Sequence, residues 1–87
     1  MDIKTIFRSM VDSGASDTFL KVGSPVSFRI DGMLEAQGQE RLGEKDIRKM
    51  IDEVLNDGQK KVFENEREID FALNVEGTGR FRGSIFH

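Results

Sequence analysis

Two arginines carry the most specific chemistry in this 87-residue sequence. Arg80 and Arg82 stand two positions apart in Gly79–His87, where apolar and polar residues alternate. Alternation with a period of two predicts a strand with one buried face, so both arginines should lie on the other face. A guanidinium is always charged, suits phosphate oxygens, and can stabilise charge on a transferring phosphoryl group. The spacing alone favours a simpler interpretation, in which both arginines balance Asp31 or Asp70 across a sheet.

The other polar residues form no recognisable catalytic or metal-binding motif. There is no Cys, which excludes disulfides and thiol chemistry, and the one histidine, His87, has no evident partner. There is no phosphate loop of the type G-x-x-x-x-G-K-[ST], and residues 77–79 are typical of a hairpin loop. Asp17 and Asp70 are assigned no acid–base role. We therefore predict no catalytic residue and no metal site within the sequence.

The composition limits the classes of partner. A net charge of −3 argues against a nucleic-acid binder and against a polybasic membrane anchor, both of which carry excess Lys and Arg. No apolar run approaches the roughly 20 residues of a spanning helix, and the N-terminus lacks a signal-peptide pattern. We expect one soluble, cytoplasmic domain of modest stability.

Apolar residues at helical spacing predict three helices. The first stripe runs from Ile3 to Val11, with Asp2 as its N-cap, and the second runs from Ile47 to Leu55. After a break at residues 56–58, a shorter helix is expected, capped by Asp57 and ending near residue 66. Val62 and Phe63 of that helix are expected to face the core.

Alternating segments predict five short strands. They cover residues 17–22, 26–31, 33–36, 69–75 and 79 onward. Asp31-Gly32 is a favoured two-residue hairpin turn, and Gln37–Gly43 is expected to be a loop. The order αβββααββ predicts the α+β class, with a mainly antiparallel sheet and the helices packed on one face. The opposite face would carry charged and aromatic residues, which suits either a docking surface or a solvated one.

Several segments resemble the N-terminal domain of the PilT and PilU type IV pilus retraction ATPases, within the secretion ATPase superfamily. The resemblance rests on Ala15–Leu20, Gly23–Pro25 and Arg29–Leu34, and Glu68–Phe71 with Gly79–Arg82 is similar to a second signature. Phe19 stands where that family usually has His, and Val26 replaces the second proline of a turn.

The resemblance implies a PAS-like fold in which residues 1–87 form the single N-terminal domain of a larger motor ATPase, truncated before a further strand and before a RecA-like ATPase domain. It implies a homo-hexamer that uses ATP and magnesium when full length and works with the pilus machinery at the cytoplasmic face of the inner membrane. The fragment itself should hold no cofactor and should not be an enzyme. By position, Arg80 and Arg82 are the candidates to contact nucleotide held by the ATPase domain of a neighbouring subunit.

A second interpretation is a free-standing PAS-like small-ligand sensor or protein-interaction adaptor. No Cys could bond a flavin and no internal His could ligate haem, so a ligand would be held non-covalently. The missing strand also predicts that the strand ending at His87 lies near an unpaired edge. Because open edges recruit other strands, we expect the isolated fragment to form an edge-strand dimer or to dimerise by strand exchange.

Overall fold

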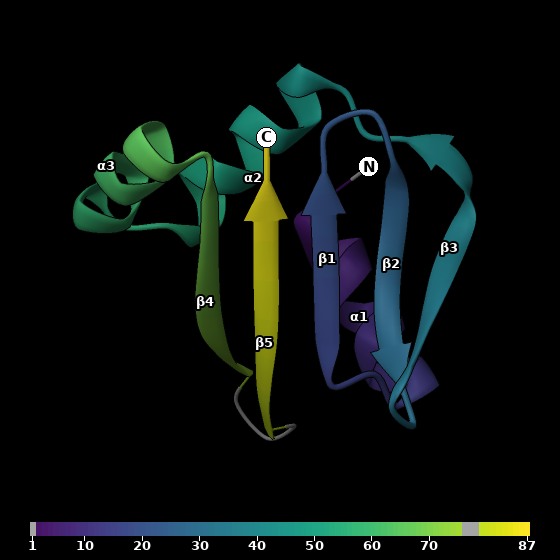
Figure 1. Ribbon diagram of the computed structural model, residues 1–87. Helices are drawn as coiled ribbons and strands as arrows, with labels where there is room; N and C mark the ends of the chain where they lie inside the picture. The colour runs from purple at the N-terminus through teal and green to yellow at the C-terminus, as the bar shows by residue number, and fades with distance from the viewer. Residues whose placement is uncertain (1, 76–78) are drawn as a thin grey trace.

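The computed structural model describes residues 2–75 and 79–87, and in them three helices and five strands (Figure 1). The elements are, in order, α1 (Ile3–Ser13), β1 (Asp17–Lys21), β2 (Pro25–Ile30), β3 (Met33–Arg41), α2 (Glu44–Val54), α3 (Asp57–Glu66), β4 (Glu68–Val75) and β5 (Gly79–Phe86). This is the element order that the sequence predicts. Residues 77 and 78 of the expected hairpin loop lie outside the described part of the structure.

One five-stranded sheet organises the fold, with the strand order β3-β2-β1-β5-β4. Three neighbouring pairs are antiparallel, and β1 and β5 are parallel. The α+β class and the mainly antiparallel sheet are therefore confirmed, with one parallel pair at the centre.

Strand β5 lies next to an edge of the sheet but is not itself an unpaired edge. This strand pairs with β1 on one side and with β4 on the other, and both ladders include Phe86. The hairpin partner β4 lies outside it, so among the described residues the edges of the sheet are β3 and β4. A dimer that adds a strand to β5 has no free edge to use.

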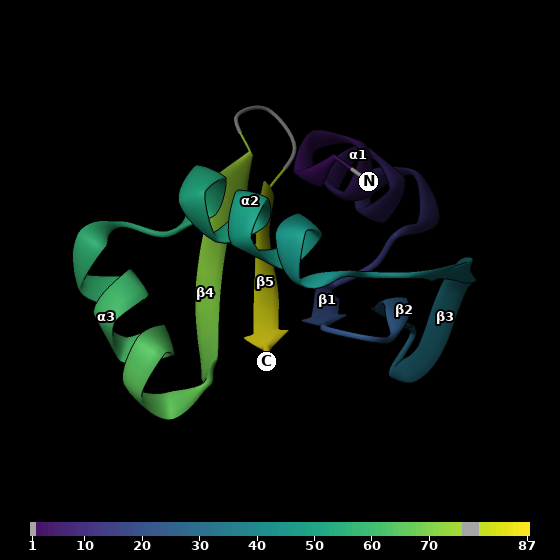
Figure 2. The same ribbon diagram turned by 90° about the horizontal axis from the view of Figure 1, so that it is seen from above.

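The helices α1 and α2 cover one face of the sheet, and α3 lies beside β4 (Figure 2). Asp2 caps α1 through its Oδ1, which accepts a hydrogen bond from the backbone N–H of Lys4 at 3.5 Å. Gly14 ends the helix in the left-handed region, with a φ of 71°. The expected N-cap of α1 is thus confirmed, and no described helix covers the other face of the sheet.

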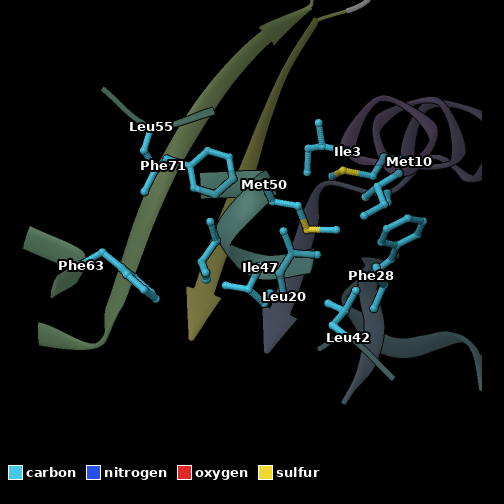
Figure 3. Packing of buried hydrophobic residues seen from close by; sticks show 14 residues of the cluster. Ile3, Met10, Leu20, Phe28, Leu42, Ile47, Met50, Leu55, Phe63 and Phe71 are labelled. Carbon is cyan, nitrogen blue, oxygen red and sulfur yellow. The ribbon is translucent and has the colours of Figure 1, made fainter. Parts of the chain in front are cut away.

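Side chains from both helices and from the sheet form one core between them (Figure 3). Its buried members include Ile3, Ile6, Met10, Leu20, Val26, Phe28, Leu42, Ile47, Met50, Leu55, Phe63, Phe71 and Ile85. The core draws on β1, β2, β4 and β5, so these strands are held by packing as well as by hydrogen bonds, whereas β3 contributes no buried side chain and is held by its pairing with β2.

Two boundaries differ from the expectation. The strand β3 does not end at Ala36 but continues to Arg41, because Gly38 adopts a φ of 83° and the register against β2 shifts there. Helix α3 is capped by Asn56 instead of Asp57. The Asn56 side chain accepts from the N–H of Gln59 at 2.8 Å, and the Gln59 side chain accepts from the N–H of Asn56 at 2.9 Å.

Helix α3 also buries less than expected. Phe63 is 7% exposed and belongs to the core, whereas Val62 is 47% exposed. The two residues are adjacent in sequence and so point about 100° apart around the helix axis. Because α3 lies beside the sheet and does not cross it, only one of them reaches the core.

The contact between Gly83 and Phe71 shows which face of β5 points outward. It lies directly opposite Phe71 of β4, and a Cβ built on Gly83 would be 2.4 Å from Cζ of that ring. The Phe71 ring therefore occupies the space of a side chain at position 83, on the same face as buried Ile85. Because side chains alternate along a strand, Arg80 and Arg82 must lie on the uncovered face.

Candidate functional site

The uncovered face of the sheet, here called the open face, carries both predicted arginines. Its central residues are Asp17, Phe19, Ser27, Arg29, Asp70, Arg80, Arg82 and Ser84. The register places Arg29 of β2 opposite Asp17 of β1, and Asp17 opposite Arg82 of β5. Two arginines therefore flank one carboxylate in a row across three neighbouring strands.

The carboxylate of Asp17 joins this row. Its Oδ1 accepts a hydrogen bond from Nε of Arg82 at 2.9 Å, and its Oδ2 accepts one from the hydroxyl of Ser16 at 2.7 Å. Nε of Arg29 lies 3.9 Å from the same Oδ2. The Asp17 side chain is only 11% exposed, whereas that of Arg82 is 78% exposed. A nearly buried carboxylate thus holds one end of an exposed guanidinium.

The pKa of Asp17 reflects these contacts. Burial alone raises the pKa, because it disfavours the charged form. The hydrogen bonds from Ser16 and Arg82, together with the positive charges of Arg82 and Arg29, outweigh burial and leave the pKa below its ordinary value. Asp17 is therefore ionised at neutral pH.

Arg80 has a different environment. It is exposed and lies opposite Asn74 of β4, beyond the end of the β1–β5 ladder, which begins at the Asp17–Arg82 pair. Within residues 2–75 and 79–87 it makes no ion pair with a carboxylate. Two residues along a strand are about 6.6 Å apart, so the two arginines are neighbours with unlike partners.

The expected balance of Arg82 by Asp31 or Asp70 is wrong. Asp70 accepts a hydrogen bond from the hydroxyl of Ser84 at 2.6 Å. Asp31 lies in the β2–β3 turn, where it and Gly32 have φ values of 51° and 80°, as a two-residue hairpin requires. The partner of Arg82 is Asp17, which the sequence analysis left without a role.

Phe19 and Arg29 form a second contact on the open face. The guanidinium carbon of Arg29 lies 5.5 Å from the centroid of the Phe19 ring, within the range of a cation–π interaction. Phe19 is half-buried. The aromatic ring at this position therefore helps to hold Arg29 beside Asp17.

A groove of about 490 Å³ lies away from the open face, between α2, α3 and the end of β5. Its apolar lining includes Ile47, Ile51 and Phe63. Nζ of Lys60 forms an ion pair with Oδ1 of Asp52 at 3.3 Å, and Nε2 of His87 lies 3.2 Å from Oε1 of Glu44. Among the described residues, no three His, Asp or Glu side chains gather as a metal site, and no helix is long and apolar enough to cross a membrane.

Comparison with known proteins shows which family the chain resembles. No protein-family model matches it. It is 36% identical over 87 residues to the type IV pilus retraction ATPase PilT of Pseudomonas aeruginosa, and 32% identical over 87 residues to the type IV pilus ATPase PilU of the same organism. Its fold matches the crystal structure of the pilus retraction motor PilT with bound ADP, with a TM-score of 0.73 and 32% identity over 99% of the chain. The chain is similar over its full length to the PilT/PilU family.

The similarity to the PilT/PilU family covers the whole chain but only part of each relative. The chain spans 23% of PilU and 25% of PilT, and 25% of the PilT chain in the crystal structure. The resemblance found in Ala15–Leu20 and Gly79–Arg82 is confirmed, and the structural match confirms the expected α+β fold. Asp17 and Arg82, one from each of these segments, are the residues that the fold brings into contact.

Proposed function

We propose that this chain is the N-terminal docking and nucleotide-sensing domain of a hexameric ATPase that powers type IV pilus retraction. In this proposal residues 1–87 are one domain of a larger motor, whose RecA-like ATPase domain binds ATP and magnesium. The motor works with the pilus machinery at the cytoplasmic face of the inner membrane. The chain itself is not an enzyme, and it acts by packing against the ATPase domains of its own and neighbouring subunits.

One observation carries the proposal. Arg82 is 78% exposed on a sheet face that no described helix covers, yet its Nε is held by Asp17. An ion pair this exposed contributes little to stability, but it orients the guanidinium, which favours contact with a phosphate in a fixed direction. One solved structure with the same fold is a PilT motor with bound ADP, a nucleotide whose phosphates an arginine can bind.

The test compares ATP turnover with folding stability in the full-length protein. Replacing Arg82 by Ala, and separately Arg80 by Ala, should lower kcat by about tenfold or more, since arginines that reach a transferring phosphoryl group contribute large factors. The thermal unfolding midpoint should change little by comparison. Arg8→Ala removes an exposed arginine from α1 and is the matched control, with kcat expected to be unchanged.

Two results would contradict the proposal. The first is a loss of activity at Arg82 that is no larger than the loss of folded protein. The second is ATP hydrolysis by the purified 87-residue chain, since the proposal leaves the nucleotide site in another domain.

A further inference from the structure

The hydrogen bond between Asp17 and Arg82 uses only one part of the guanidinium. This group has five N–H donors, one on Nε and four on the two terminal nitrogens. Asp17 accepts from Nε at 2.9 Å, and no described residue accepts a hydrogen bond from the terminal nitrogens. The end of the fork, which can bind two oxygens of one phosphate, is therefore left free and exposed.

Asp17 is itself held in place. Its backbone lies in the ladders to β2 and β5, and its two carboxylate oxygens accept from different donors, Oδ1 from Arg82 and Oδ2 from Ser16. A side chain that is 11% exposed and bonded through both oxygens has little freedom to rotate. The direction that it imposes on Arg82 is therefore well defined.

A long arginine side chain loses rotamer freedom when it binds a phosphate, and this loss weakens binding. The hydrogen bond to Asp17 removes part of that loss, because it orients the guanidinium of Arg82 before the phosphate binds. The open face also keeps Arg29 near Asp17, at 3.9 Å and against the Phe19 ring, so that a second arginine supports the ionised carboxylate.

We propose that Asp17 is a positioning residue, which orients the guanidinium of Arg82 so that its terminal nitrogens face a nucleotide phosphate held by a neighbouring subunit. The inference rests on the proposed function, because it takes Arg82 to be a nucleotide contact. It also separates the two candidate arginines. Arg82 is the oriented donor, and Arg80, which has no ion pair among the described residues, contributes positive charge without a fixed direction.

The test is a double-mutant cycle in the full-length ATPase, with Asp17→Ala, Arg82→Ala and the double variant. The kcat and KM for MgATP are measured together with the thermal unfolding midpoint. If Asp17 acts through Arg82, Asp17→Ala lowers kcat by about tenfold with a small change in KM, and it causes no further loss in the Arg82→Ala background. A purely structural role would instead give the same fractional loss in both backgrounds.

The outcomes separate this inference from the proposed function. If Arg82→Ala leaves kcat unchanged, the nucleotide-sensing role itself is wrong. If Arg82→Ala lowers kcat but Asp17→Ala does not, or if the two losses multiply, only the positioning role is wrong. Asp52→Ala is the matched control, because it removes an ion-paired aspartate from the groove and not from the open face.

A second variant covers the case in which Asp17→Ala fails to fold. Asp17→Asn keeps the size of the side chain and the Oδ1 acceptor but removes the charge. It should lower kcat less than the complete loss of Arg82 does, and this smaller loss should also vanish in the Arg82→Ala background. A loss from Asp17→Asn that persists when Arg82 is absent would overturn the inference.

Discussion

Replacing Gly83 by alanine should destabilise the domain, although the backbone of Gly83 has no positive φ that would exclude a side chain. A Cβ at this position would lie 2.4, 2.8 and 2.9 Å from three carbons of the Phe71 ring. Carbon atoms pack best at about 3.5–4.0 Å, so the ring must move by about 1 Å. Phe71 is 5% exposed and packed in the core, so it has no open space to enter.

The size of the stability loss in Gly83→Ala follows from two opposing effects. Overpacking a filled core costs about 1–3 kcal/mol, whereas replacing glycine by alanine gains about 0.4–1 kcal/mol through the unfolded chain. We expect a net loss of about 1–2 kcal/mol in the free energy of unfolding, which corresponds to a fall of roughly 4–16 °C in the Tm of a domain of this size.

Urea unfolding of the 87-residue chain measures this loss. Gly58→Ala is the control, because a Cβ there would lie at an ordinary 3.5 Å from Oδ1 of Asn56, and alanine favours the helix. It should leave stability unchanged or raise it. If Gly83→Ala proves as stable as the parent chain, the Phe71 ring does not lie over Gly83, and the packing argument that turns Arg82 outward fails.

Three further predictions concern stability. The pKa of Asp17 in the folded chain lies below its ordinary value of 3.8, so ionised Asp17 stabilises the fold fully at pH values above 3.8. This stabilisation is lost as the pH falls through the lower pKa of the folded state. Urea midpoints measured against pH should show the loss in the parent chain but not in Asp17→Asn. Asn56→Ala should cost about 1 kcal/mol by calorimetry, and Asp57→Ala less, because Asn56 caps α3. Phe63→Ala should cost about 3–5 kcal/mol and Val62→Ala less than about 0.5 kcal/mol; similar costs would refute the orientation of α3.

The sequence predicts the local elements well, because their signals are local. The stripe from Ile3 to Val11 and the cap at Asp2 lie within one segment, and α1 begins after this cap and includes the whole stripe. The order of the strands has no such signal. A strand with one buried face shows the same period at the edge of a sheet as at its centre, so alternation in Gly79–His87 could not reveal that β5 lies between β1 and β4.

At the site, local patterns place the two arginines but not the partner of Arg82. Alternation places Arg80 and Arg82 on one face, and Gly83 opposite Phe71 supports this. The ion pair with Asp17 joins residues 65 positions apart and depends on the parallel register of β1 and β5. No local pattern encodes that register. In the sequence, Asp17 is one aspartate at the start of a predicted strand. This pattern is too common to single out Asp17 as the partner of Arg82.

The central claim is that the open face presents Arg82 to nucleotide bound by another subunit. Its most direct test is a structure of the full-length assembly with a bound ATP analogue, in which the distance from the terminal nitrogens of Arg82 to the nearest phosphate oxygen is measured. We predict hydrogen-bond distances of about 2.7–3.2 Å, with Nε still bonded to Asp17. An open face turned to solvent, with Arg82 far from every phosphate, would contradict the account.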